Sequence, residues 1–546
     1  MIKTRLVSII ASLLLGVAGC GGGSSGSQPP PPPPPTPISK AEAFQFLNQA
    51  TFGATEAEAG RLIGMRYEAW IDDQFRKLPS LQLPHLQSLP PPDFMGQLHP
   101  DRVDIWFRNS LSGDDQLRQR VAFALSEIMV VSQLGALQGR PFAVADYYDV
   151  LARNAFGNYR DLLEEITLHP AMGVYLSMLG NEKPNPALNI RPDENYAREL
   201  MQLFSIGLVE VEIDGTVRLD ANDQPIPTYD QDVIEGFAHV FTGWTWALSP
   251  VFGSGRVPVS SQYTPMEHWP EYHDTGPKQL LNGIVLPAGQ TGEQDLSDAL
   301  DNIFNHPNVG PFIAIRLIQR LTTSNPSPAY VRRVAEVFNN NGAGVRGDLG
   351  AVVRAILLDA EARPSAASDV DGKLKEPLLR LTQLYRAYNA QSANGGYRQL
   401  GGVSAIFGQG PLQSPSVFNF FSPFFAPPGE IRNAGLVAPE LEIATEYQNT
   451  FITNYMLLQT FGLNQANPDL RPNDVYIDIQ QEMNVAADID ALIDLVAGKL
   501  LGGQVSAPLR TEIAGMLERL PEADPVLRAA EAIYLVVTSP EFAYQR

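Results

Sequence analysis

Four polar side chains with the chemistry of a catalytic site lie close together between Pro192 and Gly207: Glu194, Asn195, Arg198 and Glu199. At about 100° per residue a helix places these four on one side and a row of apolar residues on the other. Glu194 and Arg198 are four residues apart, which is the spacing of a helical ion pair. The spacing fits two structures, a cluster that lines a cleft or a solvated helix face with a weak ion pair.

A second group of such residues lies in the stretch from His268 to Lys278, which holds His273 and Asp274 as well. Imidazole and carboxylate groups together can bind a divalent metal or transfer protons. We expect Asp274 to orient His273. The alternative is a loop whose polar groups bond only to its own backbone.

The common catalytic and cofactor motifs are absent. The sequence contains no P-loop, no His-Glu-x-x-His, no Gly-x-Ser-x-Gly, no dinucleotide fingerprint after a strand and no haem motif. The cofactor is therefore unknown. A divalent metal remains an open alternative, with His273 and Asp274 as the candidate ligands.

The elements that must position these residues are mainly α-helices. We predict one helix over Pro192–Gly207, with Asp193 as N-cap and Gly207 as its end. A second helix is predicted over Asp230–Phe241, with a capping box from Asp232 to Glu235. Val209 to Leu219 alternates apolar and polar residues around Asp214-Gly215, which predicts one small β-hairpin at about 208–219 with a two-residue turn. The long segment 242–296 is expected to be an ordered loop.

Two stretches of the chain resemble each other. Asp161 to His169-Pro170 aligns with Asp298 to His306-Pro307, and each predicted helix ends at its histidine because proline follows. We expect both histidines to cap helix C-termini, where the helix dipole favours a cation.

The N-terminus predicts export. Lys3 and Arg5 precede an apolar run, Leu6–Val17, that is too short to span a membrane. The run ends in Leu-Gly-Val-Ala-Gly-Cys20, which resembles a bacterial lipobox with Cys20 as the lipidated residue. The alternative is an ordinary cleaved signal. We thus expect a signal peptide over 1–19, a Gly/Ser/Pro-rich tether over 20–38 and a helical body over 39–546, with a sub-boundary near 362–372. Glycine at position 21 favours the outer membrane.

Charge and cysteine content exclude several classes of protein. The formal net charge of the 546-residue chain is −21, which argues against binding to nucleic acid. Cys20 is the only cysteine, so the body has neither a disulfide nor a thiolate metal site.

Seven short motifs occur in order along the chain: Phe46-Leu-Asn-Gln-Ala-Thr-Phe-Gly53, His169-Pro170, Glu194-Asn-Tyr-Ala-Arg-Glu199, Phe241-Thr-Gly-Trp244, His273-Asp274-x-Gly276-x-Lys278, Pro415-Ser-Val-Phe-Asn-Phe420 and Ser539-Pro-Glu-Phe542. Together they closely resemble the bacterial family called domain of unknown function 1800, over roughly residues 40–546. The chain departs from the family at Asp193, where asparagine is usual, and at Met201-Gln202, where Leu-Glu is common; a catalytic role for Gln202 is therefore doubtful.

The resemblance implies an exported protein of uncharacterised activity. It implies a possible partner from a second exported family, domain of unknown function 1501, which resembles the alkaline phosphatase and sulfatase superfamily. Matched by motif, it marks the candidate catalytic residues Glu194, Arg198, Glu199, His273, Asp274 and Lys278 and the candidate binding residues Asn195 and Trp244.

Two functions fit the sequence, and it leaves open whether the protein is an enzyme. The first is a lipid-anchored accessory or scaffold protein of the cell envelope that acts with an exported hydrolase-like partner. The second is an envelope hydrolase that unites the two polar groups in one site, with or without a metal.

Overall fold

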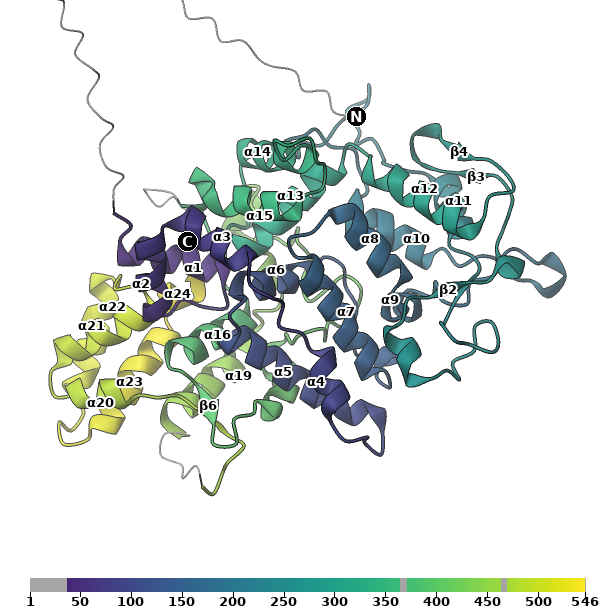
Figure 1. Cartoon of the computed structure of the whole chain (residues 1–546). Coiled ribbons are helices and arrows are strands. Elements are labelled where there is room, and N and C mark those ends of the chain that lie inside the picture. Colours follow the sequence, from purple (N-terminus) through teal and green to yellow (C-terminus); the bar gives the residue numbers. More distant parts are fainter. Residues whose placement is uncertain (1–36, 364–370, 463–468, 546) are drawn as a thin grey trace, which may run out of the picture. The chain divides into compact units, whose positions relative to one another are not determined.

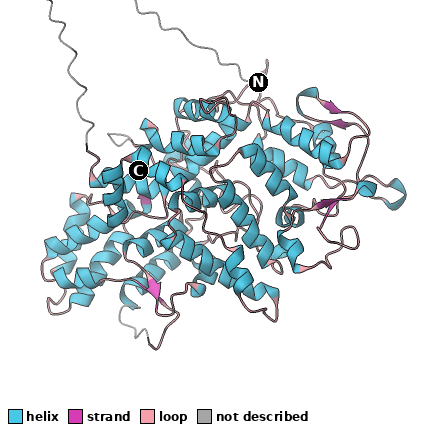
Figure 2. Cartoon of the chain, viewed as in Figure 1, coloured by secondary structure: helices cyan, strands magenta, loops and turns pink. Residues whose placement is uncertain are grey.

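Helices make up 56% of the structure, and the strands form only short antiparallel pairs (Figures 1 and 2). This computed structural model describes residues 37–363, 371–462 and 469–545. The mainly α-helical class expected from the sequence is confirmed. The chain divides into two units, Met1–Pro37 and Ile38–Arg546. The predicted signal peptide, Cys20, nearly all of the tether and most of the 362–372 boundary lie outside the described residues.

The first half of the body is a series of helices joined by loops and 3₁₀ turns: α1 Lys40–Ala50, α2 Glu56–Met65, α3 Tyr67–Phe75, α4 Leu83–Ser88, α5 His99–Ser112, α6 Gln116–Ser126, α7 Pro141–Asn154, α8 Tyr159–Leu168, α9 Pro170–Tyr175, α10 Asn195–Glu199, α11 Gln231–Val240, α12 Gly292–Phe304 and α13 Val309–Leu321.

The second half is built in the same way: α14 Pro328–Asn339, α15 Leu349–Leu358, α16 Pro377–Ala387, α17 Val403–Phe407, α18 Glu430–Asn433, α19 Glu446–Leu457, α20 Gln480–Val485, α21 Ile489–Leu500, α22 Ala507–Leu517, α23 Pro525–Val537 and α24 Pro540–Ala543. Among the described residues, no helix is long and apolar enough to cross a membrane.

The strands pair two by two: β1 Trp244–Thr245 with β2 Glu267–His268, β3 Lys278–Gln279 with β4 Val285–Leu286, β5 Lys373–Leu374 with β8 Tyr544–Gln545, and β6 Gln391–Ser392 with β7 Val475–Tyr476. The first two pairs lie within the segment 242–296, so they hold the predicted long loop in place. The β5–β8 pair joins the C-terminus to the middle of the chain.

The predicted hairpin after Gly207 is present as a ribbon of isolated bridges, including Val211 with Val217. Its turn has three residues instead of two, because Glu212 N–H donates to Thr216 O and Gly215 N–H donates to Glu212 O. Gly215 has a φ of +81°, a conformation that glycine adopts without strain and that three-residue hairpin loops require.

The helix predicted over Pro192–Gly207 is regular only in its first half. After α10 the chain continues as a π-helix, Leu200–Ser205, in which Ile206 N–H reaches back five residues to Met201 O. Gly207 ends the element with a φ of +75°. Asp193 Oδ1 accepts the N–H of Asn195, but the helix starts at Asn195 with Glu194 as its N-cap, so the predicted start at Pro192 is wrong. The prediction of one α-helix is also wrong from Leu200 onward, and Glu199 stands where the helix type changes.

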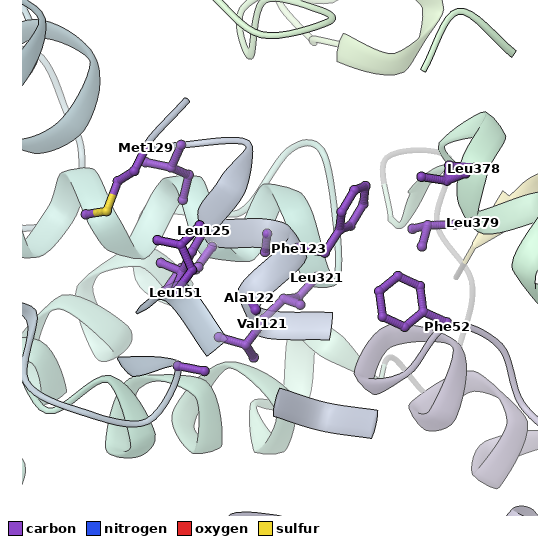
Figure 3. Close-up of a cluster of buried hydrophobic side chains, with 14 of the residues drawn as sticks. Phe52, Val121, Ala122, Phe123, Leu125, Met129, Leu151, Leu321, Leu378 and Leu379 are labelled. Atoms are coloured by element: carbon purple, nitrogen blue, oxygen red, sulfur yellow. The ribbon is translucent and has the colours of Figure 1, made fainter. Parts of the chain in front are cut away.

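One continuous apolar core joins both halves of the body. α6 crosses its centre, because every residue from Gln116 to Ser126 is buried. Figure 3 shows one cluster that contains Phe52 from the turn after α1, Phe123 from α6 and Leu379 from α16. Burial of this kind is the main stabilising term of a chain without disulfides.

The two similar stretches have the same local structure. The Nδ1 atom of His169 accepts the backbone N–H of Ala171 at 3.1 Å, and Nδ1 of His306 accepts that of Asn308 at 3.2 Å. Each neutral ring therefore caps the segment that follows it, and His169 is the N-cap of α9. His169 stands at the helix C-terminus as expected, as the C-cap of α8, whereas α12 has Asn305 as its C-cap; in both histidines Nδ1 acts as an acceptor toward the segment that follows. Burial lowers the pKa of His306 to about 4, with a smaller contribution from Arg346.

Candidate functional site

Helix α11 lies between the two groups of residues singled out in the sequence. At its start Gln231 Nε2 donates to Glu194 Oε1 at 3.0 Å, and near its end His239 Nδ1 bonds to Asp274 Oδ2. Eight residues of helix separate these contacts, a rise of about 12 Å. The helix begins at Gln231 with Asp230 as its N-cap, so the predicted capping box from Asp232 is wrong.

The first group forms a partly exposed surface, which we call the open cluster: Glu194, Arg198 and Glu199. Arg198 Nη2 donates to Glu194 Oε2 at 2.9 Å, with 41% and 34% of the two side chains exposed. An ion pair this exposed contributes less than about 1 kcal/mol to stability. Asn195 is exposed, and its backbone N–H donates to Asp193 Oδ1 at 2.8 Å.

Glu199 differs from its neighbours, because only 7% of the residue is exposed and its buried Oε2 has no hydrogen-bond partner among the described residues. Burial raises the pKa of this carboxyl, partly offset by Arg198. Tyr229 interacts electrostatically with both groups, and burial raises its pKa to about 12. Its hydroxyl is also buried without a partner. A carboxyl and a phenol are thus left with unused hydrogen-bonding capacity.

The second group forms a buried cluster: His273, Lys278 and Asp295. Their side chains are at most 1% exposed, and Asp295 Oδ2 lies 2.9 Å from His273 Nε2 and 2.6 Å from Lys278 Nζ. Lys278 Nζ also donates to the carbonyls of Asp274 and Gly276 at 2.6 and 2.9 Å. His273 Nδ1 lies 3.0 Å from Thr242 O. The buried cluster therefore ties the 268–278 segment to α12.

Asp274 does not hold His273, contrary to the expectation from the sequence. Its Oδ2 accepts from His239, its Oδ1 accepts the N–H of Gly276 at 2.7 Å, and its own N–H donates to Thr242 Oγ1. The hydrogen bond from His239 lowers the pKa of Asp274 to about 2, followed in size by desolvation, which opposes the shift. The His239 side chain is 30% exposed, and it bonds to Asp274 through Nδ1.

Trp244 is buried in β1, and its indole Nε1 has no hydrogen-bond partner. Its ring centroid lies 5.1 Å from that of His268. His268 makes no hydrogen bond through either ring nitrogen, although Glu293 Oε1 lies 3.5 Å from Nδ1. Burial lowers the pKa of this histidine. We find no contact that would place Trp244 in the open cluster.

A pocket of about 400 Å³ lies elsewhere, between α7, α8 and Tyr263. Its wall includes His169 and four carboxylates: Asp146, Asp161, Glu164 and Glu165. Asp146 Oδ2 lies 3.2 Å from His169 Nε2, while Nδ1 accepts from Ala171. Both ring nitrogens are occupied, so this histidine has no free atom for proton transfer.

The candidate metal ligands His273 and Asp274 point to different partners. Within the described part of the chain, no three His, Cys, Asp or Glu residues are placed to hold a metal ion together. The ring nitrogens of His273 and the carboxylate oxygens of Asp274, which would bind a metal, take part in hydrogen bonds within the fold.

Comparison with family models gives a match to "Protein of unknown function (DUF1800)" over residues 45–544. The chain belongs to the DUF1800 family. Comparisons with curated proteins and with solved structures found no match. Membership agrees with the resemblance seen in the seven motifs and leaves the activity of the DUF1800 protein open.

Three residues of these clusters were not singled out from the sequence: Asp295, Tyr229 and, as the partner of Asp274, His239. Asp295 lies 22 residues after His273, in the first turn of α12, where an acidic residue suits the helix dipole without further explanation. His239 stands one turn after Glu235 on α11, and nothing in this spacing indicates Asp274 as its partner. Tyr229 precedes the N-cap of α11 and carries no motif.

Proposed function

We propose that this DUF1800 protein is a lipid-anchored component of the cell envelope, an accessory or scaffold protein that acts with an exported hydrolase-like partner. The observation that supports it best is the buried cluster. His273 and Lys278, two of the strongest catalytic candidates, are bonded to Asp295 and to backbone carbonyls, so they stabilise the fold and have no free atom for a substrate.

The location and the partner rest on sequence. Cys20 in its lipobox supplies the anchor, and Gly21 favours the outer membrane. The family resemblance of the sequence suggests an exported protein of the domain of unknown function 1501 family as partner. No feature of the sequence favours binding to nucleic acid.

Affinity purification of the tagged full chain from chemically cross-linked native envelopes tests the proposal. We expect an exported hydrolase-like protein to be recovered with the wild type, and much less of it with Cys20→Ser, which cannot be lipidated. Envelope fractionation of the same two proteins measures the anchor separately. Recovery of the bait alone, from a correctly localised wild type, would contradict the scaffold function.

A hydrolase is the second candidate, and Glu199 favours it. Enzymes commonly assign acid and base roles to two carboxyl groups in different environments. Here Glu194 is ion-paired and exposed, whereas Glu199 is buried and unpartnered with a raised pKa. Glu199 would donate a proton to a leaving group, and Glu194 would activate water.

The test is hydrolysis of chromogenic esters, phosphoesters and glycosides by the purified chain. We expect any hydrolysis to be lost in Glu199→Gln and kept in Glu336→Gln, a control at an exposed position of α14. Turnover that survives Glu199→Gln would overturn this second candidate.

A further inference from the structure

Helix α19 exposes an apolar face that nothing in the described structure covers. Tyr447, Phe451 and Leu458 are 58%, 41% and 45% exposed. At 100° per residue these three positions fall within about 40° of one another, with Leu458 as the C-cap of α19, while the buried Ile452 and Met456 lie on the other side. The exposed, uncharged Asn454 lies on the same side as the three. The rings of Tyr447 and Phe451 are 4.3 Å apart. We call Tyr447, Phe451 and Leu458 the α19 face.

The sequence around this face lacks charge. Residues 447–468 contain no Lys, Arg, Asp, Glu or His, in a chain of which 18% is charged. Exposed apolar patches of this kind mark contact with another protein or with a membrane, since single exposed apolar residues scatter among charged ones elsewhere. Tyrosine and phenylalanine are common where an apolar surface meets water.

We propose that the α19 face lies against the lipid surface to which the chain is anchored. This rests on the proposed lipidation of Cys20. Seventeen residues separate Cys20 from Ile38, so the extended tether reaches roughly 60 Å at most. A bilayer within this reach is present at a high effective concentration, and a weak apolar contact is then enough to hold the body on it.

Charge favours the same face. A body with this excess of acidic residues is repelled by anionic headgroups over most of its surface. An uncharged aromatic helix face is the part that approaches them without repulsion. The α19 face carries no basic residue, so it would insert through apolar contact and would not depend on anionic lipid.

A fluorescent label at position 451 tests the contact. Because Cys20 is consumed by lipidation, Phe451→Cys gives one free thiol for labelling. Phe94→Cys is the matched control, since Phe94 is exposed to 57% and lies far along the chain in the loop after α4. Both proteins are reconstituted, lipidated and full-length, into phosphatidylcholine vesicles that contain doxyl-labelled lipid.

We expect the doxyl lipid to quench the label at position 451 and to leave the label at position 94 nearly unchanged. Vesicle flotation reports the anchor independently, so a protein that does not float contradicts the lipidation and not the face. A protein that floats, with equal weak quenching at both positions, overturns the inference. A label at 451 that is shielded from iodide in native envelopes and accessible in vesicles also overturns it, because a protein then covers the face.

Discussion

The buried cluster and the open cluster contain the same kinds of side chain, but the fold treats them differently. In the buried cluster His273 and Lys278 use their donors on Asp295 Oδ2 and on backbone carbonyls, although the buried Oδ1 of Asp295 has no hydrogen-bond partner among the described residues. In the open cluster Glu199 keeps an unpartnered carboxyl beside a half-exposed ion pair. The satisfied donors of His273 and Lys278 indicate a role in stability, whereas the buried Oε2 of Glu199 needs another explanation, such as a ligand or a proton.

The largest effect is expected at Asp295. In Asp295→Ala the buried Lys278 loses its counterion and His273 loses a hydrogen-bond partner, which costs about 3–5 kcal/mol of the free energy of unfolding. Asp301→Ala on the same helix removes an ion pair to Arg160 in which 57% of the Asp301 side chain is exposed, and it should cost less than about 1 kcal/mol. Urea unfolding measures both variants. Equal small losses would mean that the buried cluster is not structural.

The next effect is expected at Gly236, where α11 meets β3. A Cβ atom there would lie 1.8 Å from Gln279 O, so Gly236→Ala must push the loop of the buried cluster away from the helix. We expect a loss of about 1–3 kcal/mol. Gly60→Ala in α2 has open space around it and should be neutral or stabilising. A Gly236→Ala protein as stable as the wild type would show that α11 does not fix this loop.

A pH effect is expected from the hydrogen bond between His239 and Asp274. The pKa of Asp274 is lowered from 3.8 to about 2, so this bond contributes stability that is present above pH 3.8 and lost as the pH falls toward 2. In His239→Gln that pKa should return toward 3.8. The difference in the free energy of unfolding between wild type and His239→Gln should therefore become smaller as the pH falls from 3.8 toward 2. A difference independent of pH would remove His239 as the cause.

The smallest effect is expected at Glu199, and its sign is opposite. The pKa of Glu199 is raised above 4.5, so this carboxyl destabilises the folded state increasingly as the pH rises above 4.5, and fully once the pH exceeds the folded pKa. Glu199→Gln should then stabilise the protein at neutral pH by about 1 kcal/mol and by less below pH 4.5. Arg198→Ala serves as the exposed comparison. A loss of stability in Glu199→Gln at neutral pH would mean that the carboxylate has a partner in the fold.

Local signals in the sequence predicted much of the helical framework. The helix predicted over Asp230–Phe241 is observed over Gln231–Val240, and Asp230 accepts the backbone N–H of Val233 as its N-cap. Such signals depend only on neighbours in the chain. The mainly α-helical class follows from the same signals.

The partners of the site residues could not be predicted in this way. The sequence favoured the adjacent pair of His273 and Asp274, whereas each of them bonds to a residue more than twenty positions away. The burial of Glu199 fits the cleft-lining alternative for this face, which helical spacing alone could not separate from a solvated face. A change from α- to π-helix alters the angular spacing of the side chains, and no residue type in 200–205 predicts this change.

The π-helix at Leu200–Ser205 has one consequence for how the family can vary. A π-helix is equivalent to an α-helix with one residue inserted, and such segments are commonly found where function requires an unusual backbone. Deletion of a single residue there would restore a regular α-helix and turn Glu199 by about 100° relative to the residues that follow. A family member with one residue fewer in this segment would therefore keep the Glu194–Arg198 pair and lose the buried carboxyl of Glu199. The length of the segment 200–205 then marks the members that share the chemistry of Glu199.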